Sequence, residues 1–281
     1  MTGPQRSVLV TGASRGIGAA CAYELDARGF QVFAGVRWAA DGAALRASSD
    51  GRIIPVHCDV TDAASLAAAT REVTEAVGTD GLWGLVNNAG AVYAGPLEFL
   101  PVDALREQFE VNVFGLMALT QACLPLLRTA GGRIVNVSSV NGRLVSPFSG
   151  AYAASKFALE ALSDGLRMEL SRAGVRVIVV QPGAVRTSIW STSRDRAVAL
   201  SARYPAAAER YYGRVLERLE EVRVPGRALA PERVAVVVAR ALTQRRPRSR
   251  YRVGWDARVG TLLVRLLPGG LLDALVLARL R

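Results

Sequence analysis

The sequence predicts an α/β fold, in which one doubly wound parallel sheet is covered by helices on both faces. Short runs of branched apolar residues alternate along the chain with longer segments whose apolar residues recur at helical spacing. The apolar runs are nearly continuous, as expected for strands that are buried on both faces of a parallel sheet. A chain of 281 residues, 51% of them hydrophobic, is long enough to bury the core of such a sheet.

The expected strands follow one another in the first 185 residues of the chain. They span Ser7–Val10, Gln31–Gly35, Ile53–Cys58, Trp83–Asn88, Arg133–Ser138 and Val175–Gln181. Between them, helical periodicity marks Ala63–Val77, Val102–Arg128 and Tyr152–Arg172. Repeated alternation of strands and helices, joined by short turns, is typical of a doubly wound sheet.

The composition argues against several kinds of site. Cys21, Cys58 and Cys123 are far apart and form no CxxC pair, so neither a disulfide framework nor a metal site is expected. The one histidine, His57, is interpreted as structural, which argues against a His-based triad. No secretory leader and no uninterrupted apolar run of roughly 18 residues is visible. The cysteine usage makes a reducing cytoplasm the expected context.

A cluster of glycines follows the first strand, where a turn leads into a helix. Glycines at such a turn let backbone amides approach a pyrophosphate at the helix N-terminus. The spacing is GxxxGxG and not GxGxxG, but the position after the first strand still predicts a dinucleotide site. The residues expected to form it are Gly12, Ser14, Arg15, Gly16, Ile17 and Gly18.

The end of the second strand indicates which dinucleotide would bind. An NAD site places an acidic residue there, about 20 residues past the glycine turn, on the ribose 2′-hydroxyl. Here Arg37 takes that place, and Arg15 in the turn could reach the same region. Two guanidinium groups match a 2′-phosphate, so NADP(H) is predicted in preference to NAD(H). The alternative is that both arginines are merely solvated.

Two further strand ends are expected to border the same cofactor. Asp59 and Val60 follow the third strand. The Asp59 carboxylate would either accept a hydrogen bond from an adenine amino group or cap the helix that begins near Asp62. Small residues after the fourth strand would let the backbone pass close to a ribose. They are Asn88, Ala89 and Gly90.

Tyr152 and Lys156 are four residues apart, so they share one face of a helix. A tyrosine with a pKa near 10 is a poor base at neutral pH, but a nearby ammonium group lowers that pKa. Tyr152 would then exchange a proton with a substrate oxygen, to which Ser139 could also hydrogen-bond. Lys156 is the only lysine among the 35 basic residues. A compact ammonium can hold two ribose hydroxyls beside the tyrosine, which a rigid guanidinium cannot easily do.

Together these motifs resemble the short-chain dehydrogenase/reductase family. The resemblance covers roughly residues 5–190 and includes, in order, TGASRGIG, NNAG, the asparagine of VNV, a serine at a strand end, YAASK and Pro182-Gly183. It implies a Rossmann-like domain with seven strands, for which Ser249–Val253 is the candidate last strand. It also implies an oxidoreductase that moves hydride between a nicotinamide and a carbonyl or alcohol, and it places Arg15 and Arg37 in the NADP-preferring branch.

The resemblance implies a role for each matching residue. Ser139, thirteen positions before the tyrosine, would polarise the carbonyl and is selected over Ser138. Tyr152 would be the general acid and base, while Lys156 would lower its pKa and hold the nicotinamide ribose. Asn112 would anchor a water that links Lys156 to solvent. The nicotinamide side would be lined by Pro182, Gly183, Val185 and Thr187, the last near the carboxamide.

The chain is expected to form a single domain over residues 1–281, because neither a linker nor a shift in composition divides its first 185 residues. Residues 1–185 would be the cofactor-binding and catalytic core. Residues 186–228 lack strand patterns and carry charged helical patterns, so they are expected to cover the site as a substrate lid. Residues 229–281 would hold a helix, the last strand and a basic, apolar extension.

The stretch GLWGLVNNAG and the long C-terminal region resemble retinol and 17β-hydroxysteroid dehydrogenase-like members of the family. This narrower resemblance implies a bulky apolar alcohol, ketone or aldehyde as substrate, such as a steroid-, retinoid- or lipid-like compound. The family also implies a homodimer or homotetramer. The alternative is a non-catalytic NADP-binding regulator or interaction protein on the same fold, which would have no use for all four of Asn112, Ser139, Tyr152 and Lys156.

The net charge of +11 is concentrated in the last third of the chain. Residues 1–185 carry 15 basic and 16 acidic side chains, whereas residues 186–281 carry 20 and 8. Residues 254–281 are rich in leucine with scattered arginines, which fits either a peripheral contact with an anionic membrane or packing on the domain or a second subunit. No basic–aromatic motif accompanies the arginines, so nucleic acid is not an expected partner.

Overall fold

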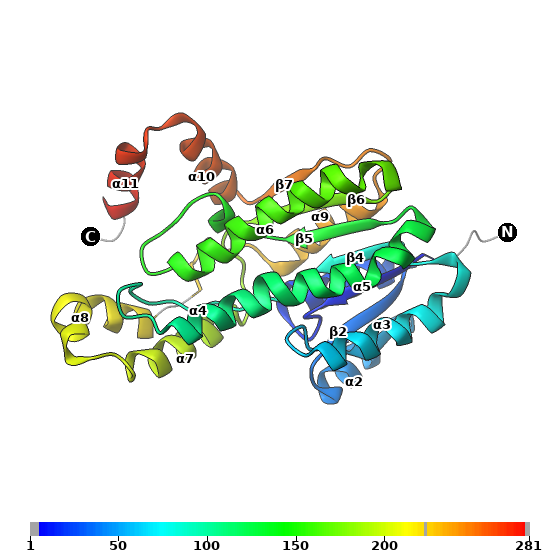
Figure 1. Cartoon of the computed structure of the whole chain (residues 1–281), viewed down its shortest axis with the longest axis horizontal. Helices are drawn as coiled ribbons and strands as arrows, with labels where there is room; N and C mark the ends of the chain where they lie inside the picture. The colour runs from blue at the N-terminus through cyan, green and yellow to red at the C-terminus, as the bar shows by residue number, and fades with distance from the viewer. Residues whose placement is uncertain (1–5, 222–223, 279–281) are drawn as a thin grey trace.

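A computed structural model of the chain describes residues 6–221 and 224–278. Its strands are β1 (Ser7–Thr11), β2 (Gln31–Val36), β3 (Ile53–His57), β4 (Gly84–Asn87), β5 (Arg133–Val137), β6 (Arg176–Pro182) and β7 (Arg250–Val253). All neighbouring strands are parallel, in the order β3-β2-β1-β4-β5-β6-β7. The doubly wound sheet predicted from the sequence, including its last strand, is confirmed (Figure 1).

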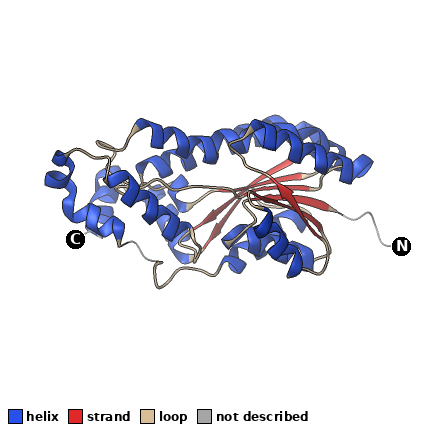
Figure 2. Cartoon of the chain, turned by 90° about the horizontal axis from the view of Figure 1, so that it is seen from below, coloured by secondary structure: helices blue, strands red, loops and turns tan. Residues whose placement is uncertain are grey.

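Helices cover both faces of this sheet (Figure 2). They are α1 (Gly16–Ala27), α2 (Ala39–Ala47), α3 (Ala63–Val77), α4 (Val102–Phe109), α5 (Gly115–Ala130), α6 (Gly150–Glu169), α7 (Ile189–Ser201), α8 (Ala206–Glu220), α9 (Pro231–Thr243), α10 (Trp255–Leu266) and α11 (Gly269–Ala278). Single turns of other helix types are η1 (Gly78–Asp80), η2 (Glu110–Phe114), η3 (Val140–Gly142) and η4 (Leu170–Ala173).

Alternate residues of each strand supply the core on the two faces. In β1, Val8 and Val10 pack with residues of α1 and α9, whereas Leu9 packs with residues of α3 and α5 on the opposite face. All three side chains are fully buried. The side-chain alternation of a strand therefore explains why both faces need apolar residues and why the strand sequences are nearly continuously apolar.

The predicted helix Val102–Arg128 is a continuous helical run that contains a π-type turn, η2, between α4 and α5. Asn112 lies in this turn and is fully buried. The run from Val102 to Ala130 is also the one stretch, among the described residues, that is long and apolar enough to cross a membrane. Half of its most apolar window is buried inside the protein, as for a core helix.

The segment after β6 forms α7 and α8, which lie beside α4 at one end of the molecule (Figure 1). The Arg203 guanidinium contacts the Asp103 carboxylate of α4 at 2.8 Å, and the Tyr212 hydroxyl donates to Glu98 at 2.9 Å. The charged helical pattern that reaches Arg223, and the apolar extension that reaches Arg281, both end outside the described residues.

Candidate active site

A pocket opens at the carboxyl ends of the central strands, where ligands bind in doubly wound folds. Most of the residues predicted for a dinucleotide line it together. They are Gly12, Ser14, Arg15, Gly16, Ile17, Arg37, Asp59, Val60, Asn88, Ala89, Gly90, Tyr152, Lys156 and Thr187. Residues far apart in the sequence, such as Arg15 and Thr187, are therefore brought to one cavity by the strand order.

The glycine turn is shaped by backbone angles and close contacts. Gly12 and Gly16 have φ of +61° and +60°, a region that favours glycine. A Cβ at Gly18 would lie 2.1 Å from the carbonyl oxygen of Gly12, so α1 can pack on the turn only without a side chain there. Gly18 thus shapes the turn from behind the pocket wall.

Thr11 and Asn88 brace this turn against the end of β4. The Thr11 hydroxyl accepts hydrogen bonds from the backbone amides of Asn88 and Ala89, both at 3.0 Å. The Asn88 side chain donates to the carbonyl oxygens of Thr11 and Gly12 at 3.0 and 3.2 Å. These bonds fix the distance between the first and fourth strand ends, between which the pocket lies.

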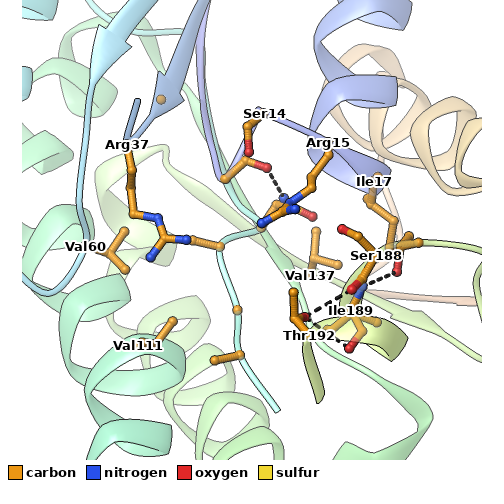
Figure 3. Close-up of a pocket in the computed structure, with 18 of the residues that line it drawn as sticks. Ser14, Arg15, Ile17, Arg37, Val60, Val111, Val137, Ser188, Ile189 and Thr192 are labelled. Carbon is orange, nitrogen blue, oxygen red and sulfur yellow. Dashed lines mark hydrogen bonds between the residues drawn. The ribbon is translucent and has the colours of Figure 1, made fainter. Parts of the chain in front are cut away.

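Arg15 and Arg37 direct their guanidinium groups into the pocket from facing sides (Figure 3). Arg37 follows β2 and lies close enough to Asp59 to lower the pKa of that carboxyl group. Burial raises the Asp59 pKa, but two hydrogen bonds from Thr61, with Arg37 and His57, outweigh it and the net pKa is lowered. Asp62, not Asp59, accepts the capping bond at the start of α3, from Ala64 N at 2.9 Å.

Asn112 lies behind the pocket wall, not in it. Its side-chain oxygen accepts from Ala91 N at 2.8 Å, and its amide donates to Ala91 O at 3.1 Å and to Ser155 Oγ at 3.0 Å. A Cβ at Gly90 would lie 3.4 Å from the Asn112 oxygen and 3.9 Å from Lys156 Nζ. Asn112 therefore joins the loop after β4 to the helix that carries Tyr152 and Lys156.

The Ser139 hydroxyl lies close enough to that of Tyr152 to lower the pKa of the tyrosine through hydrogen bonding. Ser139 is buried and also accepts from Asn141 N at 3.1 Å, which holds its hydroxyl in place. Ser138 instead lines the pocket, and its buried hydroxyl has no partner among the described residues. The hydrogen bond to Tyr152 favours Ser139 as the serine of the site.

The pKa of Tyr152 is raised in the protein, which corrects the expectation that Lys156 lowers it. Burial is the larger cause and raises the pKa, and the bond to Ser139 only partly offsets it. Lys156 Nζ lies 5.8 Å from the centre of the Tyr152 ring and donates to the carbonyl oxygen of Val137 at 3.0 Å. Burial lowers the pKa of Lys156 to about 8, and the charge of Glu160 raises it against that effect.

Of the residues after β6, Thr187 lines the pocket and packs against the glycine turn, where a Cβ at Gly16 would lie 3.0 Å from its methyl group. Pro182 ends β6 and Gly183 follows it, outside the pocket wall. Val185 is buried in the core and bridges to Leu229. The Asp256 carboxylate accepts from Ala184 N at 2.7 Å and so fixes this turn from α10.

The pocket also includes residues that sequence reasoning missed. Most come from strand ends next to predicted residues: Gly35, Val36, Cys58, Thr61, Ala91, Val137 and Ser138. Val111 lies in η2, beside Asn112. Others belong to α7 or cap its start: Ser188, Ile189, Thr192 and Arg196. The hydroxyl-rich run after Thr187 was a usable signal for the first of these. The guanidinium of Arg196 stacks 4.9 Å from the ring centre of Tyr93. Nothing in the sequence distinguishes Arg196 from the other basic residues among the 20 in residues 186–281.

The residues present fit a nicotinamide dinucleotide. The glycine turn exposes backbone amides at the start of α1, and two cations reach the position beside the second strand end. Gly90 leaves room next to Lys156 that a side chain would fill. The glycine turn, the two arginines and the buried ammonium of Lys156 thus lie along one pocket.

The sequence profile described as short chain dehydrogenase matches residues 6–197. Among curated proteins, the chain is 39% identical to retinol dehydrogenase 16 of Mus musculus, over 96% of this chain and 87% of that protein. It is 38% identical to 17-beta-hydroxysteroid dehydrogenase type 6 of Bos taurus, over 95% of this chain and 86% of that protein.

Solved structures give the same match. A short chain dehydrogenase from Burkholderia cenocepacia, in complex with NADP, is 29% identical with a TM-score of 0.75, over 98% of this chain and 99% of that one. A short chain dehydrogenase/reductase from Burkholderia phymatum, in complex with NAD, is 28% identical with a TM-score of 0.77, over 95% and 94%.

Proposed function

The chain belongs to the short-chain dehydrogenase family of oxidoreductases, which act on CH–OH and C=O groups, and we propose that it is an NADP(H)-dependent member. The observation that carries the cofactor preference is the pair of guanidinium groups, Arg15 and Arg37, facing one another at the pocket (Figure 3). They would hold the 2′-phosphate, which only NADP carries. The remaining wall residues would hold the rest of the dinucleotide.

The proposed reaction uses four residues. The bound nicotinamide supplies or accepts the hydride. Tyr152, kept neutral by its raised pKa, donates a proton to the carbonyl oxygen of a substrate in reduction and takes it back in oxidation. Ser139 hydrogen-bonds that oxygen and orients the Tyr152 hydroxyl. Lys156 provides a buried positive charge on the same helix face, and Asn112 fixes the loop beside it.

We infer a bulky apolar substrate from the surroundings of the pocket. Residues 186–228, proposed as a lid, meet the core through an aromatic cluster. The Tyr212 ring lies 5.9 Å from Phe99 and 6.0 Å from Phe148, both in edge contact. Phe148 lies four residues before Tyr152. The relatives named for retinol and hydroxysteroids support a steroid-, retinoid- or lipid-like alcohol, ketone or aldehyde.

We also propose a cytoplasmic protein that makes peripheral membrane contact through α10 and α11. Large apolar side chains of these helices are exposed, among them Leu262, Leu266, Leu271 and Leu275. None of the described residues of α11 is buried, although this helix is apolar apart from Asp273. Arg258 and Arg265 lie on the same segment and would meet anionic head groups. A homodimer or homotetramer covering this surface is the other proposal.

The function is tested by following absorbance of NADPH and of NADH with a panel of aldehydes, simple ketones, ketosteroids and retinal. NADPH-dependent consumption with an apolar member of the panel is expected. Preference for NADH would overturn the interpretation of Arg15 and Arg37. Tight NADPH binding without turnover of any member would favour a non-catalytic regulator instead.

A further inference from the structure

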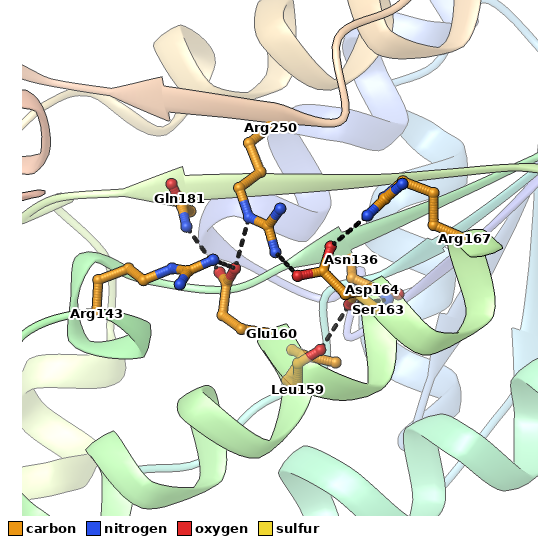
Figure 4. A network of polar contacts seen from close by, with 9 residues as sticks. All are labelled: Asn136, Arg143, Leu159, Glu160, Ser163, Asp164, Arg167, Gln181 and Arg250. Atoms are coloured by element: carbon orange, nitrogen blue, oxygen red, sulfur yellow. Dashed lines mark hydrogen bonds and ion pairs between the residues drawn. The ribbon is translucent and has the colours of Figure 1, made fainter.

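Glu160 is a buried carboxylate that the proposed chemistry does not use. It lies one helical turn after Lys156 on α6 and is 3% exposed. Three side chains from other elements converge on it (Figure 4). Arg250 Nε and Gln181 Nε2 lie 3.0 and 2.9 Å from its oxygens, and Arg143 Nη2 lies 3.4 Å away. Burying a carboxylate is costly unless it is paired, and these three donors supply the partners that Glu160 needs.

The groups that meet at Glu160 come from the segments that carry the site. Arg143 directly follows η3, the turn that begins after Ser139. The turn also approaches Glu160 closely, because a Cβ at Gly142 would lie 2.9 Å from Glu160 Cγ and 2.8 Å from Ser138 Oγ. Gln181 immediately precedes the Pro182-Gly183 turn. One carboxylate thus connects the serine turn, the end of β6 and the helix of Tyr152.

Charge adds to this geometry. Burial pulls the pKa of Lys156 down to about 8, and the negative charge of Glu160 raises it. The second carboxylate of the network, Asp164, lies a further turn along and contacts Arg250 at 2.6 Å and Arg167 at 3.0 Å. The titratable and charged groups around Glu160 are Tyr152, Lys156 and Asp164 on α6, Arg143 after η3 and Arg250 on β7.

We propose that Glu160 is a positioning residue for the carbonyl–alcohol chemistry: its carboxylate fixes the turn that carries Ser139 and places a negative charge one helical turn from Lys156. The inference rests on the proposed function, since the site it serves is the one described above. Asp164 also contacts Arg250, but it lies a further helical turn from Lys156. A variant of Asp164 therefore serves as a control for the loss of a contact between α6 and β7.

Lys156 is the only lysine in the chain, so protein labelled with ¹³C at the lysine ε-carbon gives one side-chain signal to titrate. In the parent protein that signal should titrate near pH 8. In Glu160→Gln it should titrate about one pH unit lower or more, and in Arg143→Gln it should move to higher pH. Asp164→Asn should match the parent.

An unchanged titration in Glu160→Gln, or an equal shift in Asp164→Asn, would overturn the inference. Circular dichroism and thermal unfolding establish that each variant is folded. Should Glu160→Gln fail to fold, the opposite shift in Arg143→Gln carries the test, and its absence overturns the inference. Because the titration needs no turnover, it is read independently of whether the proposed function holds.

Activity supplies a second readout once the parent enzyme turns over. The alkaline limb of the pH–rate profile should move to lower pH in Glu160→Gln, with kcat falling about fivefold or more at pH 8 and KM for the ketone changing little. A profile that coincides with that of the parent enzyme would contradict the proposal. A parent enzyme without turnover would count against the proposed function alone.

Discussion

At the scale of single residues, the structure explains why one lysine stands among many arginines. Lys156 is 5% exposed and its ammonium group donates to Val137 O at 3.0 Å. A compact ammonium needs few partners in such a place, whereas a guanidinium brings five N–H donors in a fixed fork. The buried charge nevertheless costs stability, since burial lowers its pKa from 10.5 to about 8.

Replacing Lys156 by methionine should therefore stabilise the fold and abolish turnover. Between pH 8 and 10.5 the unfolded chain holds the lysine proton more tightly than the folded one, so the parent gains stability as pH rises through this window. The variant should be more stable at pH 7 by on the order of 3 kcal/mol, and the difference should shrink towards pH 10.5. Urea unfolding at several pH values measures it. A difference independent of pH would contradict the interpretation.

Arg37 should determine the choice of cofactor. Arg37→Ala removes charge-assisted bonds worth about 1.5–3 kcal/mol, so NADPH should bind roughly tenfold to hundredfold more weakly. NADH affinity should change little, because NADH carries no 2′-phosphate. Fluorescence titration with both dinucleotides measures the two affinities. Arg46→Ala, an exposed arginine on α2, is the matched control. If Arg37→Ala weakened the binding of NADH as much as that of NADPH, Arg37 would not contact the 2′-phosphate.

Residue types and spacing predicted most of the residues of this pocket, but not the pKa values and hydrogen-bond partners of its side chains. The glycines, Arg15 and Arg37 were predictable because each stands beside a strand end. The raised pKa of Tyr152 was not, because burial of the tyrosine in the folded chain outweighs the effect of Ser139. Ser138 and Ser139 show the same limit: the Ser139 hydroxyl interacts with Tyr152, whereas the Ser138 hydroxyl has no partner among the described residues, and only the turn after β5 decides which is which.

At the scale of elements, the junction of β1 and α1 depends on the absence of one side chain. Gly18→Ala places a Cβ 2.1 Å from Gly12 O, so α1 must move away from the turn. We expect a loss of about 1–3 kcal/mol in unfolding free energy and at least tenfold weaker dinucleotide binding. Gly165→Ala, on α6 with its nearest contact at 3.8 Å, should be neutral or stabilising. Thermal unfolding and titration of both variants test this, and similar behaviour would refute it.

Elements with strong patterns were predicted closely, and irregular ones were not. The helix α3 has the bounds Ala63–Val77 that its periodicity predicted. The strands differ from their predicted ends by a residue or so, because hydrogen bonding and not apolarity sets where a strand stops. The π turn η2 left no visible signal in the sequence, because it adjusts the helix to hold Asn112 against Ala91 and Ser155.

At the scale of the whole molecule, α10 and α11 lie away from the sheet core at the C-terminal end (Figure 1). Replacing Leu271 and Leu275 by glutamate should leave the thermal unfolding temperature within about 2 °C and sharply reduce sedimentation with phosphatidylglycerol vesicles. Both side chains are about half exposed, at 58% and 48%. Met168→Glu, an exposed apolar residue of α6, is the control and should retain vesicle binding.

Vesicle binding that survives the double replacement would contradict a membrane role for α11. A fall in molecular mass on size exclusion, without any vesicle binding by the parent protein, would instead assign this surface to a second subunit. The fold could be predicted because one pattern repeats along it. The binding partner of the C-terminal surface could not be predicted, because exposed leucine and arginine side chains fit both an anionic membrane and a second subunit.

Tyr152 transfers the proton in the proposed carbonyl–alcohol reaction, so Tyr152→Phe removes the group on which turnover depends. The replacement removes one hydroxyl and keeps the ring. With NADPH and the best ketone or aldehyde of the panel, kcat should fall by about a hundredfold or more, while the dissociation constant for NADPH stays within a few-fold of the parent value. Undiminished turnover by the folded variant would contradict the account.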